Sequence, residues 1–115
     1  MINVISLSEL LDYKTPSSLN FMIVRSMENQ IDGVQQFDKL APSFELLNFW
    51  NNSQKTDEDW RIYKKQFEWE LQQWNAQLGL KIISGLAEDN DINLICYCRE
   101  FVHCHRFLVA EALVK

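Results

Sequence analysis

Glycine and proline are scarce in this chain of 115 residues, which has three of the former and two of the latter. The glycines, Gly33, Gly79 and Gly85, stand far apart, so the chain lacks a glycine-rich loop of the kind that cradles phosphates. No repeat, low-complexity segment or Gly/Ser-rich linker interrupts the sequence. The length and the lack of a linker predict a single domain over residues 1–115.

Long apolar runs are also missing. No stretch of about 18 uninterrupted apolar residues occurs, so a membrane-spanning helix is not expected. The N-terminus lacks the basic region and apolar core of a secretory signal. The three cysteines are an odd number, and two of them are one residue apart, which favours reduced thiols or metal ligands over a disulfide framework. These absences predict a cytoplasmic protein.

Positive charge is in deficit, because 11 Lys and Arg residues stand against 16 Asp and Glu, for a formal net charge of -5. Proteins that bind nucleic-acid backbones present a basic face, so such a partner is not expected. A small anionic ligand remains compatible, since Arg99, His103, His105 and Arg106 form one local basic spot. Apolar side chains are plentiful, at 47% of the residues with four Trp, three Tyr and seven Phe, which is sufficient for a compact core.

Three short apolar runs bounded by turn residues predict strands, and they lie at residues 1–5, 20–25 and 92–95. Helical segments separate them, an alternation typical of parallel sheets. The predicted fold class is α/β, with a small, mostly parallel sheet flanked by helices in a Rossmann-like three-layer arrangement. Ligands of such sheets bind beyond the carboxyl ends of the strands. Arg25 and the pair of Cys96 and Cys98 follow two of these ends and are expected to meet in one crevice.

The helices are predicted from capping residues and from periodicity. Ser6 and Glu9 have the spacing of a capping box at the start of a short helix. Residues 26–41 are expected to be irregular, and a helix then begins at Pro42 and continues through Trp50.

The strongest helical signal follows Thr56, a predicted N-cap before an acidic first turn. Apolar side chains then recur every three or four residues, at Trp60, Tyr63, Phe67, Leu71, Trp74 and Leu78. This stripe predicts one helix that ends before Gly79, and a further short helix over 81–88. Core packing is the preferred interpretation of its aromatic rings, ahead of ligand stacking.

All three cysteines and both histidines lie within residues 96–106, at a predicted strand-to-helix turn. An anion site there would combine the free N–H groups of the helix start with Arg106 and Arg25. A thiol site would use Cys104, whose thiolate is expected to be favoured by the neighbouring His and Arg side chains. Cys98, six positions earlier, would then resolve an oxidised Cys104.

A metal site is the third chemical interpretation of this cluster. It contains five potential zinc ligands within ten residues, namely Cys96, Cys98, His103, Cys104 and His105. The Cys-x-Cys spacing is not usual for zinc, and the chain has no second ligand pair. No metal ligand is therefore assigned, the cofactor is left unknown, and a zinc-stabilised domain is kept as an alternative.

Purely structural roles compete with all three interpretations. Cys96 lies inside an apolar strand and is expected to pack in the core. Arg106 would pair with Glu100 or Glu111, and the two histidines would lie on the surface. The concentration of these residue types in one turn nevertheless favours a functional role for the turn as a whole.

The same turn has a recognisable arrangement, in which an apolar strand ends at Leu94-Ile95-Cys96 and Cys104-His105-Arg106 starts a helix with Leu108, Ala110 and Leu113. This arrangement resembles the C-terminal signature of the family called domain of unknown function 488. Residues 39–46, followed by Trp60, Tyr63 and Leu71, resemble a block of one branch of that family. Val24-Arg25 is similar to its Asp-Val-Arg strand end, with Ile23 in place of the acid.

The resemblance implies an α/β fold and a site made of Arg25, Cys104, His105 and Arg106. It implies no particular substrate, because the activity of the family is not established. Cys98 and His103 depart from its pattern and are local additions.

The sequence thus predicts a small protein that binds or processes a phosphate-bearing, nucleotide-like ligand at the Cys-His-Arg turn. The alternative is a non-catalytic protein-interaction or regulatory module on the same scaffold. The expected catalytic residues are Cys104 and His105. The expected ligand-binding residues are Arg25, Cys98, His103 and Arg106.

Overall fold

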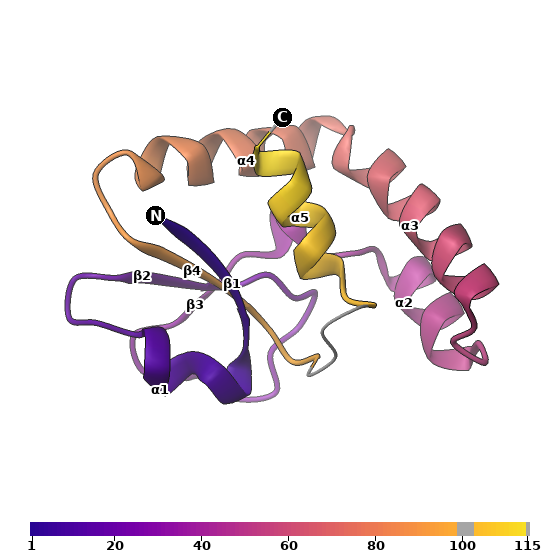
Figure 1. Ribbon diagram of the computed structural model, residues 1–115, viewed down its shortest axis with the longest axis horizontal. Helices are drawn as coiled ribbons and strands as arrows, with labels where there is room; N and C mark the ends of the chain where they lie inside the picture. The colour runs from indigo at the N-terminus through magenta and orange to yellow at the C-terminus, as the bar shows by residue number, and fades with distance from the viewer. Residues whose placement is uncertain (99–102, 115) are drawn as a thin grey trace.

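The computed structural model describes residues 1–98 and 103–114, and Figure 1 shows its arrangement. In chain order its elements are β1 (Ile2–Ser6), the 3-10 turn η1 (Leu7–Glu9), α1 (Leu10–Tyr13), β2 (Leu19–Met22), β3 (Gln35–Gln36), the 3-10 turn η2 (Asp38–Leu40), α2 (Phe44–Asn52), α3 (Asp57–Leu71), α4 (Trp74–Ala87), β4 (Ile92–Cys96) and α5 (His105–Leu113). None of the helices in these two ranges is long and apolar enough to cross a membrane.

The four described strands form one sheet in the order β1-β4-β2-β3, and every neighbouring pair is parallel. β4 is central: Ile92 is in register with Ile2 on one side and with Leu19 on the other. Its five residues are all buried, as expected for a strand covered on both faces. The predicted α/β class with a small parallel sheet is confirmed.

Apolar side chains pack on both faces of the sheet, which makes three layers. On one face Phe21 and Leu94 belong to a large cluster with residues of α2, α3, α4 and α5. On the other face Met22 and Ile95 pack with Leu10 of α1. Figure 1 shows α4 and α5 on one side of the strands and α1 on the opposite side.

A ladder of asparagine side chains crosses the three longer strands. Asn93 of β4 is 1% exposed and donates to Asn20 Oδ1 of β2 at 2.8 Å, while Asn3 of β1 donates to Asn93 Oδ1 at 3.1 Å. These residues are cross-strand partners in the register of the sheet. Because a buried amide without partners is costly, the ladder fixes the relative register of β1, β4 and β2.

The predicted caps are present. Ser6 N–H donates to Glu9 Oε1 at 3.0 Å, although the helix that this box starts is the 3-10 turn η1 followed by α1. Thr56 Oγ1 accepts from Asp59 N–H at 3.1 Å, and the Asp59 carboxylate accepts from Thr56 N–H at 3.2 Å. The helix predicted to begin at Pro42 is α2, which begins two residues later, at Phe44, with Ser43 as its N-cap.

The prediction of one helix over 57–78 with Gly79 as its stop is wrong. α3 ends at Leu71 and α4 begins at Trp74, which is 78% exposed and does not continue the buried stripe. Gly79 is a buried residue inside α4, and a Cβ built there would lie 2.9 Å from Cβ of Lys39. Glycine therefore serves close packing of α4 on η2 and does not end a helix. The helix predicted over 81–88 is the second half of α4.

The strand predicted at 20–25 is shorter, because β2 ends at Met22, although Ile23 N–H still donates to Ile95 O at 2.9 Å. The segment expected to be irregular contains β3 and η2. β3 pairs with β2 through Phe21 and Met22. Its two exposed glutamines carry no alternating apolar pattern, so this edge strand could not be predicted from periodicity.

Candidate functional site

The parallel topology places the predicted site residues at one edge of the sheet. β4 ends at Cys96, Arg25 follows the end of β2, and Cys104 is the N-cap residue of α5. β2 and β4 are neighbours in the sheet, so the segments that follow them lie side by side. Arg99 and Glu100, considered above as part of the basic spot and as a partner of Arg106, lie outside the described residues.

A cavity of about 460 Å³ lies at this edge and is called the sheet-edge cavity below. Residues from β4, α5, α2, α3 and the segment after β2 line it together. Its lining includes Val24, Arg25, Ser26, Glu28, Pro42, Leu47, Trp50, Asn51, Lys55, Tyr63, Cys96, Tyr97, Cys98, His103, Cys104 and His105. Five of the six predicted site residues therefore border one cavity, and Arg106 is not among them.

Two cysteine sulfurs meet at the floor of the sheet-edge cavity. Cys96 Sγ and Cys104 Sγ are 3.1 Å apart, and the two residues are 1% and 3% exposed. Cys98 is set apart from them, since its Sγ lies 3.9 Å from the carbonyl oxygen of His103. The structure thus brings Cys104 together with Cys96, and not with Cys98 as the sequence suggested. Cys96 packs in the apolar core as expected, but it also takes part in this pair.

The buried guanidinium of Arg106 contacts both sulfurs of the pair. Its Nη1 lies 3.2 Å from Cys96 Sγ and 3.9 Å from Cys104 Sγ, and it donates to Cys98 O at 2.6 Å. The residue is 1% exposed, and its guanidinium carbon stands 4.6 Å from the centre of the Phe107 ring. Arg106 was predicted to bind a ligand directly, but its guanidinium contacts the two sulfurs and does not line this cavity.

The expectation that Cys104 has the favoured thiolate is wrong. The hydrogen bond with Cys104 and the closer guanidinium of Arg106 lower the pKa of Cys96 to about 6, against the cost of burial. The same hydrogen bond, burial and the charge of Cys96 raise the pKa of Cys104. The thiolate is therefore favoured on Cys96, because that sulfur is nearer to Arg106.

His105 is buried and anchors the start of α5 to the end of β2. Its Nε2 is 2.7 Å from Ile23 O, so the neutral ring carries its proton on Nε2 and donates it to that carbonyl. Nδ1 then remains an acceptor, 4.0 Å from Cys104 Sγ. Burial lowers the pKa of His105 to about 4, against the hydrogen bond to Ile23, and the charge of Arg106 lowers it further.

Aromatic rings of α2 and α3 enclose His103 on the opposite wall. The His103 ring stacks on Trp60 at 4.9 Å between centroids with an interplanar angle of 22°, and it meets the edge of Trp50 at 6.0 Å. Its Nε2 lies 3.9 Å from the Asp57 carboxylate. Burial, together with the nearby Cys104, raises the pKa of Tyr63, which stacks on Trp60 at 5.2 Å.

The sequence did not show that Tyr63 of the aromatic stripe, and Trp50 of α2, line a cavity. Trp60 and Tyr63 do pack against the core, as predicted, but Tyr63 and Trp50 also line the sheet-edge cavity. Periodicity reports only that one helix face is turned inward, and it does not show that a cavity lies beneath the end of that face. Tyr97, next to two cysteines in the sequence, was the only local signal.

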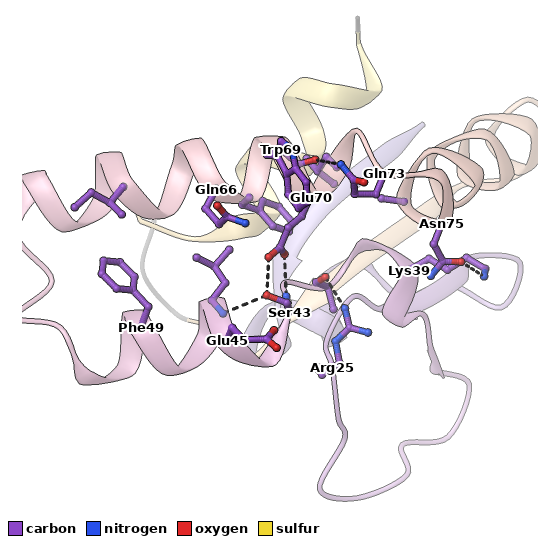
Figure 2. A pocket seen from close by; sticks show the side chains of 16 residues that line it. Arg25, Lys39, Ser43, Glu45, Phe49, Gln66, Trp69, Glu70, Gln73 and Asn75 are labelled. Carbon is purple, nitrogen blue, oxygen red and sulfur yellow. Dashed lines mark hydrogen bonds between the residues drawn. The ribbon is translucent and has the colours of Figure 1, made fainter.

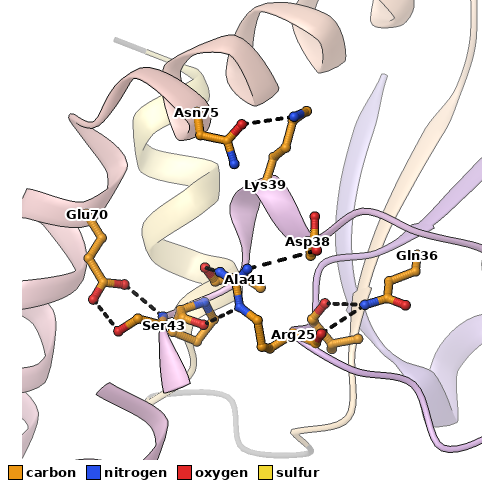
Figure 3. A network of polar contacts seen from close by, with 10 residues as sticks. Arg25, Gln36, Asp38, Lys39, Ala41, Ser43, Glu70 and Asn75 are labelled. Carbon is orange, nitrogen blue, oxygen red and sulfur yellow. Dashed lines mark hydrogen bonds and ion pairs between the residues drawn. The ribbon is translucent and has the colours of Figure 1, made fainter. Parts of the chain in front are cut away.

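Arg25 is tied to the segment that leads into α2, as Figure 3 shows. It donates through Nε to Pro42 O at 3.1 Å and through Nη2 to Ala41 O at 2.9 Å, and its Nη1 lies 3.9 Å from the Asp38 carboxylate. Gln36 holds the backbone of Arg25 by donating to its carbonyl oxygen at 3.0 Å. Arg25 thus forms a fixed wall between the sheet-edge cavity and a second cavity.

The second cavity, of about 620 Å³, lies between α2 and α3 and is called the α2–α3 cavity. Figure 2 shows Phe49 and Trp69 on its two helices, with the Glu70 carboxylate directed at Ser43. That carboxylate accepts from Ser43 N–H at 2.9 Å and from Ser43 Oγ at 2.5 Å. No predicted site residue other than Arg25 lines it.

Within residues 1–98 and 103–114, no three His, Cys, Asp or Glu side chains are grouped so that they could hold a metal ion. The zinc alternative therefore has no ligand set in this part of the chain.

Comparison with known proteins gives one match. The family model described as the active DUF488-N3 subclade matches residues 10–115, which include both walls of the sheet-edge cavity. No functionally curated protein and no solved structure matches the chain. The resemblance that rests on the Cys-His-Arg turn is confirmed at the level of the family.

Proposed function

This chain belongs to the DUF488-N3 subclade, and from the site that it carries we propose that it binds a small, phosphate-bearing, nucleotide-like ligand in the sheet-edge cavity. The observation that carries the proposal is the composition of that cavity. Aromatic side chains, three basic side chains and a reactive sulfur pair border a single space of about 460 Å³ at the carboxyl edge of a parallel sheet. That volume is in the usual range for a small-molecule site.

The charged lining supports an anionic group on the ligand. Arg25, Lys55 and His103 border the cavity, and Glu28 is its only described acidic neighbour. Arg25 donates two of its five N–H groups to the carbonyls of Ala41 and Pro42. These hydrogen bonds fix the orientation of its guanidinium before a ligand binds. A fixed guanidinium loses little entropy when it binds a phosphate oxygen.

The aromatic lining supports an unsaturated ring as the second part of the ligand. Trp50, Tyr63 and Tyr97 all border the cavity. A planar base stacked on such a side chain gains about 1–3 kcal/mol without regard to its hydrogen-bonding pattern. A base and a phosphate joined by a sugar would therefore satisfy both kinds of wall.

Processing of this ligand would use the sulfur pair. In the step that we propose, Cys96 Sγ attacks an electrophilic centre of the ligand, and the bond to the leaving group breaks as the new bond forms. Cys104 gives its thiol proton to the leaving group. Water then attacks the same centre, and the bond between that centre and Cys96 Sγ breaks. A proton of the water returns to Cys104, and Cys96 is left as the thiolate. His105 keeps the start of α5 in place through its hydrogen bond to Ile23 O.

Binding is tested by titration calorimetry with nucleoside mono- and diphosphates and with inorganic phosphate. The charge-reversing variant Lys55→Glu is expected to weaken binding at least about tenfold, since it places a carboxylate beside the bound phosphate. Lys81→Glu, on the exposed face of α4 and away from the cavity, is the matched control and should bind as the wild type. If no nucleotide or phosphate binds at millimolar concentration, the proposal fails.

A protein-interaction module is the second candidate, favoured by the α2–α3 cavity. Ile62 and Trp69 border this cavity and are 48% and 59% exposed, and Phe44 on α2 is 61% exposed. Large apolar side chains gathered at one place are typical of a protein contact. The partner tested is a second copy of the chain, by sedimentation over a range of concentrations. Association weakened by Trp69→Ser but not by Trp74→Ser, at a site that is still more exposed, supports this candidate, and a monomer at every concentration removes it.

A further inference from the structure

Cys96 and Cys104 are placed as a pair that can close into a disulfide. Their sulfurs are 3.1 Å apart, although the residues belong to different elements, the end of β4 and the N-cap of α5. A disulfide has a sulfur–sulfur distance of about 2.05 Å, so bond formation requires an approach of about 1 Å. Both cysteines are free thiols in the structure.

The two sulfurs are not equivalent, and their difference suits a redox reaction. Arg106 Nη1 is closer to Cys96 Sγ, at 3.2 Å, than to Cys104 Sγ, at 3.9 Å. A guanidinium beside a sulfur favours its thiolate, which is the form that reacts with peroxides. Cys96 is thus the attacking thiolate, and Cys104 is the thiol next to it.

Access to the pair is narrow. Cys96 and Cys104 border the sheet-edge cavity but are only 1% and 3% exposed. A small oxidant can reach them through the cavity, whereas a second protein cannot place its own sulfur on Cys96 without displacing the walls. This restriction favours a bond within the chain over a bond between chains.

We propose that Cys96 and Cys104 reduce a small hydroperoxide and are converted to an intramolecular disulfide. Cys96 thiolate attacks one peroxide oxygen, so that a sulfur–oxygen bond forms, the oxygen–oxygen bond breaks and hydroxide leaves. Cys104 then attacks Cys96 Sγ, the sulfur–oxygen bond breaks, and the released hydroxide takes the Cys104 proton as water. The thiolate–thiol pair loses two electrons and one proton, and with one further proton from the solvent hydrogen peroxide becomes two water molecules. A small external thiol reductant restores the pair.

This activity goes beyond the proposed ligand binding and does not depend on it. The sulfur pair and Arg106 supply everything that the oxidation requires apart from the peroxide and the reductant. Lys55→Glu, which is expected to weaken nucleotide binding, should therefore oxidise at the wild-type rate. The two proposals can fail separately.

The test treats the whole chain with hydrogen peroxide and follows it by intact-mass and peptide mass spectrometry. The expected product has lost two hydrogens and contains a Cys96–Cys104 link that a thiol reductant reverses. Cys98→Ser, the matched control, should form the same link. Cys104→Ser should stop at a sulfenic acid on Cys96, which dimedone traps. A link that includes Cys98, or a chain that forms no link while Cys98 alone is oxidised, would overturn the proposal.

Arg106 acts on the reaction only through Cys96, whose thiolate it favours, so its role is tested by the pH dependence of Cys96 alkylation. Arg106→Gln should raise the pH at which Cys96 is half alkylated by iodoacetamide and slow its reaction with peroxide roughly tenfold at pH 7. Arg106→Lys should restore part of both. An unchanged alkylation profile in a folded Arg106→Gln chain would contradict the assignment. Where that variant does not fold, the link formed by the Cys98→Ser chain still decides the proposal.

Discussion

Replacing His105 by asparagine isolates the effect of burying an imidazole that cannot take up a proton. The ring donates from Nε2 to Ile23 O at 2.7 Å and is buried against Phe67, with ring centroids 5.7 Å apart. An asparagine side chain is uncharged at all pH values and retains an N–H donor for that carbonyl. The variant therefore removes the titration of His105 while it keeps a polar partner for Ile23.

The magnitude follows from the shift in pKa. Burial lowers the pKa of His105 from 6.5 to about 4. Below pH 6.5 His105 binds a proton in the unfolded chain but stays neutral in the folded chain. The free energy of unfolding therefore decreases as the pH falls from 6.5 towards 4. The full loss is roughly 3 kcal/mol, and about 2 kcal/mol of it falls between pH 7 and pH 5.

The assay is urea unfolding followed by tryptophan fluorescence at pH 7, 6 and 5. The free energy of unfolding of the wild type should fall about 2 kcal/mol further over this range than that of His105→Asn. Cys96 contributes its own loss as the pH falls from 9 through its folded pKa of about 6, but that loss is present in both proteins and cancels in the difference. Equal slopes for the wild type and His105→Asn would refute the buried neutral imidazole.

Three further predictions concern packing and caps, each measured as a free energy of unfolding. Gly79→Ala should destabilise the chain, because its Cβ would lie 2.9 Å from a side chain of η2, whereas Gly85→Ala meets nothing within 4 Å and should stabilise α4 by about 0.5–1 kcal/mol; equal effects would contradict the close packing of α4. Phe67→Ala, at a site 1% exposed, should cost about 3–5 kcal/mol, while Ile62→Ala, at a site 48% exposed, should cost under about 1 kcal/mol; similar costs would place Phe67 outside the core. Thr56→Ala removes the acceptor for the third N–H of α3 and should cost about 1 kcal/mol; an unchanged stability would show that the cap is not used.

Local signals in the sequence predicted the elements well where one segment decides its own structure. Thr56 and Ser6 capped helical segments because their side chains reach N–H groups only three residues away. The apolar run at residues 92–95 became the central strand because nothing in it can face water without cost. Gly79 misled for the opposite reason, since its role is set by contact with η2, which lies 40 residues away in the chain.

The sequence indicated where the candidate site residues gather, but it did not show which of the two sulfurs lies closer to Arg106. The cluster at residues 96–106 and Arg25 pointed to the carboxyl edge of the sheet. Of the described residues, Arg25, Cys96, Cys98, His103, Cys104 and His105 line one cavity there, and Arg106 does not. Because Cys104 is next to His105 and Arg106 in the sequence, its thiolate was the one predicted to be favoured. The fold turns Arg106 back to Cys96 instead, at 3.2 Å.

The sequence by itself determined the α/β class, the chain order of the three longer strands and the turn that gathers the cysteines, because these depend on periodicity, caps and composition within short segments. Only the tertiary structure decided which groups touch. The return of α5 onto β4 and β2 brings Cys104 to Cys96 and His105 to the carbonyl of Ile23, contacts that span 8 and 82 residues. Because Coulomb and hydrogen-bond energies depend on distances of a few ångströms, the charge of the sulfur pair and the neutrality of His105 are properties of the folded chain alone.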